Sequence, residues 1–171
     1  MIPLTVRGSE FLLTAMRIGI GYDSHKFTDG RPLILGGVVI PYKKGLLGHS
    51  DGDCLAHAII DSLLGAAGMP NIGQLFPDTD PEWKDVKSTE LLKRVISEMN
   101  KKGFTILWID TVIIAEEPKL NPYIPAMKKA LSVAGLPEEI INIKPKTNEG
   151  MGFTGRLEGI AAIATSLVQS G

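Results

Sequence analysis

The sequence predicts a single α/β domain that has a small mixed β-sheet of about four strands, helices mainly on one face of the sheet, and a β-hairpin. Segments rich in β-branched and aromatic residues alternate with segments whose apolar residues recur every three or four positions, as they do in helices. The 171 residues suffice for one domain with a substantial core. No repeat, low-complexity tract or linker interrupts the sequence.

The first half of the domain is expected to contain a strand, a hairpin and a helix. Residues 17–25 begin with isoleucines that alternate with glycines, which favours a strand. Residues 33–40 place apolar residues on both sides of a Gly-Gly pair, which is typical of a β-hairpin. A helix capped by Ser50 or Asp51 should follow and end at Gly68.

The second half is expected to alternate helices and strands. A helix is predicted over 88–103, and the β-branched and aromatic residues of 104–115 give the clearest indication of a strand. A third helix, opened by a proline, is predicted within 122–135 and a short strand over 141–144. Residues 160–168 are small and apolar, and they fit a helix or a buried strand equally well.

Composition excludes several classes of partner. The net charge is −1, so no basic surface for nucleic acid is expected. No apolar run is long enough to span a membrane. The single Cys54 excludes an intrachain disulfide, and its apolar setting indicates a small buried core residue. We expect a cytoplasmic location and leave a plastid origin open.

The start of the chain does not resemble the rest. Residues 1–15 lack the apolar run of a signal peptide, and Gly8-Ser9-Glu10-Phe11 resembles a cloning-site linker. Met16 resembles a natural start. We therefore expect an N-terminal extension or a cloning-derived segment over 1–15 and the folded domain over 16–171, a short natural extension being the alternative.

All three histidines of the chain lie in one stretch, together with several aspartates. Asp23 and His25 are two apart in the predicted strand and therefore point to one side of it. His57 lies in the predicted helix, with Asp53 and Asp61 one turn away on either side. A strand pair plus one helix histidine would supply three ligands and leave a fourth position open, as in a catalytic zinc site.

Spacing alone does not decide which three groups bind the metal, and His49 is a further candidate. A helix histidine beside leucines is more often a packed core residue, but the clustering of every histidine favours a metal site. We expect Asp53 or Asp61 to support the His57 ring or to act at the helix N-terminus, rather than to bind zinc.

Several segments carry a specific resemblance when they are taken in order: 17–25, 36–38, 40–42, 45–53, 57–67, 72–80 and 152–159. Each is a weak signal alone. Together they resemble the 2-C-methyl-D-erythritol 2,4-cyclodiphosphate synthase family of the non-mevalonate isoprenoid pathway. The resemblance extends from residue 16 to the C-terminus.

The resemblance implies a ring-closing phosphoryl transfer. The 2-phosphate of 4-diphosphocytidyl-2-C-methyl-D-erythritol 2-phosphate attacks the β-phosphorus, and CMP leaves. The resemblance also implies zinc together with magnesium or manganese, and a homotrimer whose active sites lie between subunits. It also suggests an isoprenoid diphosphate, bound at the trimer centre, as a candidate ligand.

The resemblance also assigns roles by position. The implied zinc ligands are Asp23, His25 and His57. His49 and Thr147 become catalytic contacts of the substrate phosphate, and Glu149 becomes the contact of the second divalent ion. The implied substrate-binding residues are Asp23, Ser24, His25, His49, Ser50, Asn71, Ile72, Gly73, Phe76, Pro77, Asp78, Thr79, Asp80, Ala115, Glu116, Glu117, Pro118, Lys119, Leu120, Asn121, Lys146, Thr147, Asn148, Glu149, Phe153 and Arg156.

The sequence departs from the family pattern at a few positions. Asn71 stands where many members have an aspartate that contacts ribose, and an amide can still accept a hydrogen bond. Residues 146–148 replace a threonine-rich segment, and Glu116 and Glu117 add acidity that has no evident role. Without the resemblance, Phe76 and most of the loop positions would be taken as ordinary core and turn residues.

Two other functions compete with the cyclising synthase. A metal-dependent phosphohydrolase would use the open metal position to activate water and would release orthophosphate. A non-enzymatic module would bind a metal or an isoprenoid phosphate and release no product. The reaction product therefore separates the three hypotheses.

Overall fold

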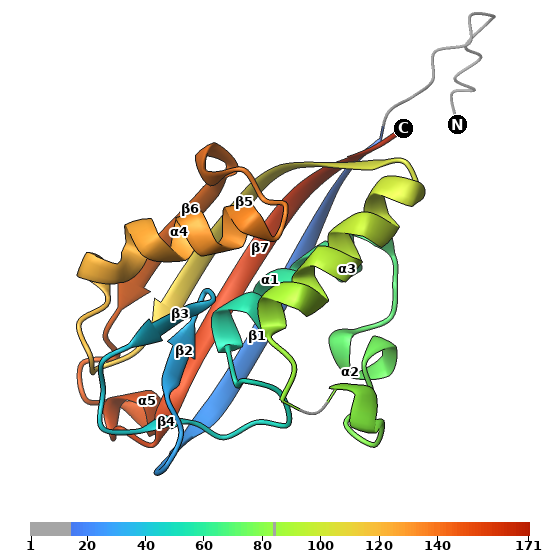
Figure 1. Ribbon diagram of the computed structural model, residues 1–171. Coiled ribbons are helices and arrows are strands. Elements are labelled where there is room, and N and C mark those ends of the chain that lie inside the picture. The colour runs from blue at the N-terminus through green and yellow to red at the C-terminus, as the bar shows by residue number, and fades with distance from the viewer. Residues whose placement is uncertain (1–14, 84) are drawn as a thin grey trace, which may run out of the picture.

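The computed structural model of the chain describes residues 15–83 and 85–171. A five-stranded sheet has the order β4-β1-β7-β5-β6, and β2 and β3 form a separate two-stranded hairpin (Figure 1). β6 pairs parallel with β5, and the other neighbours in the sheet pair antiparallel. The strands are β1 (Met16–Thr28), β2 (Leu33–Leu35), β3 (Val38–Ile40), β4 (Gly45–Leu46), β5 (Phe104–Ile114), β6 (Ile141–Lys146) and β7 (Gly159–Ser170). The helices are α1 (Cys54–Ala67), α2 (Ile72–Leu75), α3 (Ser88–Lys101), α4 (Ile124–Val133) and α5 (Gly152–Gly155).

The predicted mixed α/β domain with a hairpin is confirmed, but the expected number of strands is wrong. Residues 160–168, which fitted helix or strand, belong to β7 at the centre of the sheet. β7 is buried along the face that carries small residues such as Ala162, Ala164 and Ser166, where a helix lies against it. β4 has two residues, which is too short to leave a sequence pattern. The element boundaries elsewhere lie close to the predicted ones.

The three long helices lie on one face of the sheet, as predicted (Figure 1). α1 packs directly on β1 and β7, and two glycines of β1 permit the contact. A Cβ atom added at Gly19 would lie 1.8 Å from the carbonyl oxygen of Ser62, and one at Gly21 would lie 2.0 Å from that of Ala58. Backbone therefore touches backbone, and the position of α1 relative to β1 is fixed without intervening side chains.

The first turn of α1 is capped by Asp53, and the prediction of Ser50 or Asp51 was wrong. The Asp53 carboxylate accepts a hydrogen bond from the backbone N–H of Ala56. It also accepts the N–H groups of Gly36 and Gly37 in the turn of the β2–β3 hairpin. One buried carboxylate thus joins a helix N-terminus to a hairpin turn, which the sequence alone did not indicate.

The opposite face of the sheet carries a row of exposed apolar side chains. Ile18, Ile20 and Tyr22 of β1 are 76%, 71% and 55% exposed, and Trp108 of β5 is 44% exposed. Strand pairing places Ile18 beside Leu167, which in turn pairs with Trp108. An apolar surface of this extent, continuous across three strands, is characteristic of a contact surface. We call this surface the bare face of the sheet.

Among the described residues, no helix is long and apolar enough to cross a lipid bilayer. Residues 1–14 lie outside the described part of the chain, so the expectation of an extension or cloning-derived segment over 1–15 stays a prediction. Cys54 is fully buried at the start of α1, as predicted.

Candidate metal centre and active site

The predicted ligands come together where α1 crosses the end of β1. One ligand atom from each of Asp23, His25 and His57 lies within 4.8 Å of the others. The Asp23 Oδ2 atom is 2.9 Å from both His25 Nε2 and His57 Nδ1, and these two nitrogens are 3.1 Å apart. Two residues of a strand and one of a helix thus form a candidate metal site, in the arrangement that the spacing predicted.

The two imidazole rings are oriented by their other nitrogens. His25 Nδ1 lies 2.7 Å from the carbonyl oxygen of Leu47, which can only accept a hydrogen bond. His25 Nδ1 therefore carries a proton, and His25 Nε2 is the nitrogen that faces the candidate site. His57 Nε2 lies 2.8 Å from the Ser88 hydroxyl and 3.1 Å from the Ser50 hydroxyl. Hydrogen bonds of this kind commonly orient metal-binding histidines.

The electrostatics of the cluster favour an ionised carboxylate. Burial alone would raise the pKa of Asp23, but hydrogen bonds from His25 and His57, together with their charges, hold it well below its usual range. Burial alone would lower the pKa of His25, but the hydrogen bond and the charge of Asp23 raise it. The carboxylate is thus available as an anionic ligand at any pH near neutrality.

His49 lies on an exposed loop that an arginine holds. The Arg31 guanidinium donates to the carbonyl oxygens of Gly48 and Ser50, the two neighbours of His49 in the chain. The His49 carbonyl oxygen accepts the N–H of Asp85. The His49 backbone is therefore fixed on both sides, whereas its side chain stays exposed beside the candidate site. Arg31 had no signal in the sequence that connected it with this site.

Neither Asp53 nor Asp61 contacts the His57 ring. Asp53 acts at the helix N-terminus, which was one of the two roles expected for it. The Asp61 carboxylate accepts the N–H of Ile72 at 2.8 Å and thereby holds the start of α2 beside α1. The supporting contacts of His57 come instead from Ser88 and Ser50, which sequence reasoning missed as partners of this ring.

A small pocket of about 160 Å³ opens beside the candidate site. Its lining combines the histidines with the segment after α1, and consists of His25, His49, Ser50, His57, Ile72, Gly73, Phe76, Asp78, Trp83 and Leu91. Six of the predicted substrate-binding residues outside the metal ligands are therefore next to the metal site: His49, Ser50, Ile72, Gly73, Phe76 and Asp78. The Asn71 amide oxygen accepts the N–H of Gln74 and caps α2, which leaves its amide N–H groups for other partners.

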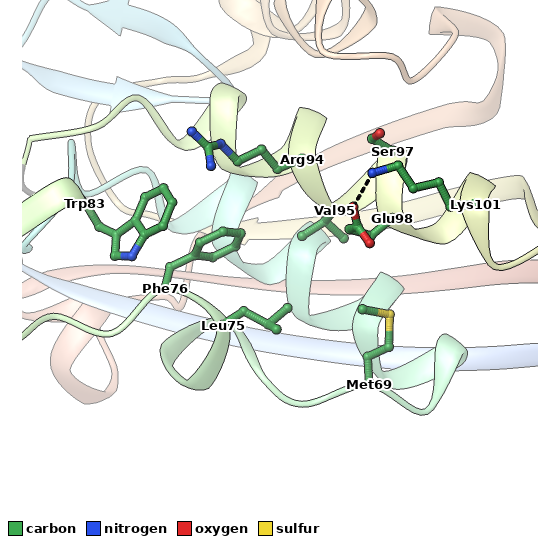
Figure 2. A pocket seen from close by; sticks show the side chains of 9 residues that line it. All are labelled: Met69, Leu75, Phe76, Trp83, Arg94, Val95, Ser97, Glu98 and Lys101. Atoms are coloured by element: carbon green, nitrogen blue, oxygen red, sulfur yellow. Dashed lines mark hydrogen bonds and ion pairs between the residues drawn. The ribbon is translucent and has the colours of Figure 1, made fainter. Parts of the chain in front are cut away.

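Phe76 and Trp83 separate this pocket from a larger one. They line both, and their rings meet edge to face with centroids 5.0 Å apart. The larger cavity, of about 530 Å³, lies between α3 and the segment after α1, and is mostly apolar (Figure 2). Arg94 of α3 stacks on Trp83 at 4.8 Å. The larger cavity contains none of the metal ligands, so its size does not make it the reaction site.

The remaining predicted residues lie elsewhere on the chain. Ala115, Pro118, Lys119, Leu120, Asn121, Lys146 and Thr147 line a separate pocket of about 190 Å³ beyond the ends of β5 and β6. The Glu116 carboxylate accepts the N–H groups of Asn148 and Gly150, so it joins the two loops of that pocket. Glu116, for which the sequence indicated no role, therefore has a structural one, since it connects these loops. The Thr147 hydroxyl donates to Glu149 at 2.7 Å.

Phe153 and Arg156 are at a third place, on and after α5. Phe153 lines a pocket with Ser24 and His25, on another side of the metal ligands. Arg156 is exposed and pairs with Glu158 at 2.7 Å. Most of the predicted substrate-binding residues that line pockets are thus divided among three places on one chain, while Asn71 lines a further pocket beside α1 and Arg156 lines none of them.

Comparison with known proteins identifies the group to which this arrangement belongs. A sequence model described as the YgbB family matches residues 16–169. The chain belongs to the YgbB family. The 2-C-methyl-D-erythritol 2,4-cyclodiphosphate synthase of Enterococcus faecalis is 55% identical over 155 residues, which are 90% of this chain and 99% of that protein. The resemblance stated from the sequence motifs is therefore confirmed.

Solved structures of YgbB relatives agree with the fold. A 2C-methyl-D-erythritol-2,4-cyclodiphosphate synthase in a CDP-bound form aligns with a TM-score of 0.81 and 40% identity, covering 89% of this chain and 99% of that one. A bifunctional protein from Campylobacter jejuni aligns with a TM-score of 0.88 and 41% identity. The alignment covers 92% of this chain and 43% of that longer chain.

Proposed function

We infer that the chain catalyses the reaction after which its curated relatives are named. An oxygen of the 2-phosphate attacks the β-phosphorus of 4-diphosphocytidyl-2-C-methyl-D-erythritol 2-phosphate. The bond from that phosphorus to the bridging oxygen breaks, and CMP leaves with the oxygen and its electron pair. The product is 2-C-methyl-D-erythritol 2,4-cyclodiphosphate. The observation that carries the inference is the Asp23–His25–His57 cluster in a chain 55% identical to a named synthase.

The donor set fits a zinc ion, which we propose as the metal of this cluster. Tetrahedral zinc with bonds of about 2.0–2.1 Å separates its ligand atoms by about 3.3 Å. The three donor atoms are 2.9, 2.9 and 3.1 Å apart, so the side chains need to open by only a few tenths of an ångström. A zinc ion bound there would draw electron density from a phosphate oxygen and make the phosphorus more electrophilic.

The chain's own residues would then position the phosphates. We propose that His49 and Thr147 contact the reacting phosphate, and that Glu149 holds a magnesium or manganese ion beside the leaving CMP. His49 is exposed in the pocket beside the metal ligands, which supports its role. No general base is required, because the attacking phosphate oxygen is already anionic, so positioning and charge stabilisation carry the reaction.

We propose that the functional unit is a homotrimer with active sites between subunits. The metal ligands and the loops proposed for the nucleotide lie in separate pockets of one chain. β1 and β6 are three strands apart in the sheet, which corresponds to about 14 Å. A neighbouring copy that covers the bare face would both bury its apolar side chains and bring a second set of loops to the metal. An isoprenoid diphosphate at the trimer centre and a cytoplasmic location stay predictions.

Phosphorus NMR of the purified chain with the cytidine diphosphate substrate and magnesium tests the function. We expect a cyclic diphosphate and CMP in equal amounts. The same mixture treated with a zinc chelator serves as control and should leave the substrate unchanged. Release of orthophosphate instead would favour the competing phosphohydrolase and contradict this proposal. The alternative has no support in the comparisons, since the curated relatives are named as synthases.

A further inference from the structure

The wall between the two neighbouring pockets is held from outside by an arginine of α3. Phe76 and Trp83 form this wall, and their rings meet at an interplanar angle of 72°. The Arg94 guanidinium lies over the Trp83 ring, 4.8 Å from its centroid (Figure 2). The same guanidinium lies 3.5 Å from the Glu82 carboxylate. Arg94 therefore contacts two successive residues of the segment that follows α2.

A planar guanidinium can make both contacts at once. Its face is attracted to the electron-rich face of an indole ring, while its N–H groups point outward in their own plane toward a carboxylate. The two contacts are unequal here. The side chains of Glu82 and Arg94 are both more than half exposed, so water screens their ion pair and it contributes little. The stacking on the half-buried Trp83 ring is consequently the contact that fixes the wall.

Arg94 has a firm support in α3. Five apolar side chains of this helix are buried in the core, namely Leu91, Leu92, Val95, Ile96 and Met99. The start of the helix is also fixed, because the Ser88 backbone N–H donates to Asp51 Oδ2 at 3.0 Å. Arg94 projects from the exposed side of α3 at the edge of the larger cavity. The arginine thus connects a helix that is anchored in the core to the segment that carries Trp83.

The hydrogen bonds of that segment do not replace this connection. Every hydrogen bond described for residues 77–83 stays within residues 77–86, and none of them reaches α3. The end of the segment is held separately, since the N–H of Asp85 donates to the His49 carbonyl oxygen at 3.1 Å. Loss of the Arg94 guanidinium should therefore loosen the Trp83 ring while the His49 backbone stays in place.

We propose that Arg94 is a positioning residue, which keeps the Trp83 and Phe76 rings in place as a wall of the pocket beside the metal ligands. The proposal rests on the proposed function, because the substrate would occupy that pocket. Arg94 lines the larger cavity but not the smaller pocket, so it acts through Trp83. A wall that contacts the substrate equally before and during the reaction contributes to binding rather than to the chemical step.

Steady-state kinetics of the full chain with the cytidine diphosphate substrate test this role. Arg94→Gln should raise KM about two- to fivefold, the range expected for loss of an exposed cation–π contact, and should leave kcat unchanged. In a Trp83→Leu background the same change should raise KM no further, since the ring that the arginine holds is gone. Glu82→Gln should stay close to the wild type, because it removes only the ion pair. Lys93→Gln removes a charge from the neighbouring exposed position of α3 and is the matched control.

A second measurement follows the ring itself and needs no activity. The chain contains two tryptophans, Trp83 and Trp108, so fluorine NMR of the protein labelled with 5-fluorotryptophan gives two signals, which Trp83→Phe assigns. The Trp83 signal should broaden or split in Arg94→Gln, because the ring samples more positions, and should stay sharp in Glu82→Gln. Trp108 lies on the bare face of the sheet, and its signal should be the same in every variant.

The two measurements together decide the proposal. A Trp83 signal as sharp in Arg94→Gln as in the wild type would overturn it. So would an equal rise of KM in Lys93→Gln or Glu82→Gln, a full additional rise in the Trp83→Leu background, or a fall in kcat with unchanged KM. If the wild type forms no cyclic product, the proposed function fails, and the fluorine signals alone decide whether Arg94 holds the ring. A mobile ring and a raised KM in Arg94→Gln, with neither change in the two glutamine controls, would establish the role of Arg94.

Discussion

At the metal-binding end, three donor atoms from β1 and α1 already lie within 4.8 Å of one another. The loops proposed for the nucleotide, by contrast, form a separate pocket beyond β5 and β6, and the Glu116 carboxylate accepts two N–H groups that join them. The metal end is complete within one chain because a helix and a strand meet there without intervening side chains. The end proposed for the nucleotide consists of loops, and we propose that a second subunit closes it on a ligand. Changes at the metal end should therefore alter zinc binding, and changes at the other end should alter substrate binding.

The largest effect is expected from removal of a ligand at the metal end. His57→Ala should lose tightly bound zinc and reduce kcat/KM by more than about a hundredfold, since it deletes a direct ligand rather than a supporting contact. His49→Ala should retain zinc and lose rate, because His49 is not one of the clustered donors. Metal analysis of the purified proteins beside initial rates checks both. Equal zinc content in the wild type and in His57→Ala would show that the ligand assignment is wrong.

The next effect concerns the surface proposed to bring the two ends together. Ile20→Glu places a charge at the centre of the bare face, where Ile20 is 71% exposed in the single chain. An unpaired charge buried at an interface costs about 3–5 kcal/mol, which should dissociate a trimer. Light scattering should report a trimer for the wild type and a monomer for the variant.

The control for that variant is Val39→Glu, an exposed valine on the hairpin, which should stay trimeric. The variant monomer should keep its zinc and lose nucleotide binding, since the metal end is built within one chain. A wild type that is monomeric at working concentration would contradict the proposed trimer.

A smaller effect is expected from a change at the close contact between β1 and α1, the two elements that carry the metal ligands. Gly21→Ala would place a Cβ atom 2.0 Å from the Ala58 carbonyl oxygen, so α1 must move away from β1. Overpacking of this kind costs about 1–3 kcal/mol and should lower both Tm and zinc affinity. Gly65→Ala lies at the same helix–strand contact with 3.7 Å of room, and it should be neutral or stabilising in thermal unfolding. Equal losses in both variants would argue against a specific close approach at Gly21.

The smallest effect is expected at the nucleotide end. Glu116→Gln replaces the ionised acceptor of two backbone N–H groups by a neutral one, which weakens the connection between the loops by about 1 kcal/mol. KM for the substrate should rise several-fold while zinc content stays at the wild-type level. Glu139→Gln, an exposed change in the short 3-10 helix before β6, should alter neither quantity. A fall in kcat with unchanged KM would place Glu116 in the chemical step instead.

The sequence predicted a cluster of possible metal ligands because periodicity and the grouping of the histidines indicate one, while the choice of Asp23, His25 and His57 came from the family resemblance. A residue spacing of two places Asp23 and His25 on one side of a strand whatever the rest of the fold, but the packing of α1 on β1 is what brings His57 to them. The supports of the ligands were not predictable in the same way. Ser88 and Leu47 reach the histidines through tertiary contacts between distant segments, and neither residue type is unusual where it stands.

The errors at the sheet and the helix cap have the same origin. The sequence of β7 fitted a helix or a strand because its small residues suit a close contact in either structure. The packing of α1 against these residues favours the strand. Ser50, Asp51 and Asp53 are all residue types that cap helices, so the sequence offered three candidates within four positions. The hairpin turn that also binds Asp53 selects it, and this contact is invisible to local pattern reasoning.

The contact between Asp51 and Ser88 also has a consequence for how the chain folds. Lys87, the residue that precedes α3, provides no side-chain cap, and the N–H of Ser88 is accepted by a carboxylate 37 residues earlier. The N–H of Ser88 consequently has its recorded partner only outside the helix, and it is satisfied only after a long loop has closed. Ordering of this helix end and docking of the loop beside the histidines therefore belong to one cooperative event. A chain that has formed α3 completely has, by the same step, brought the support of His57 into place.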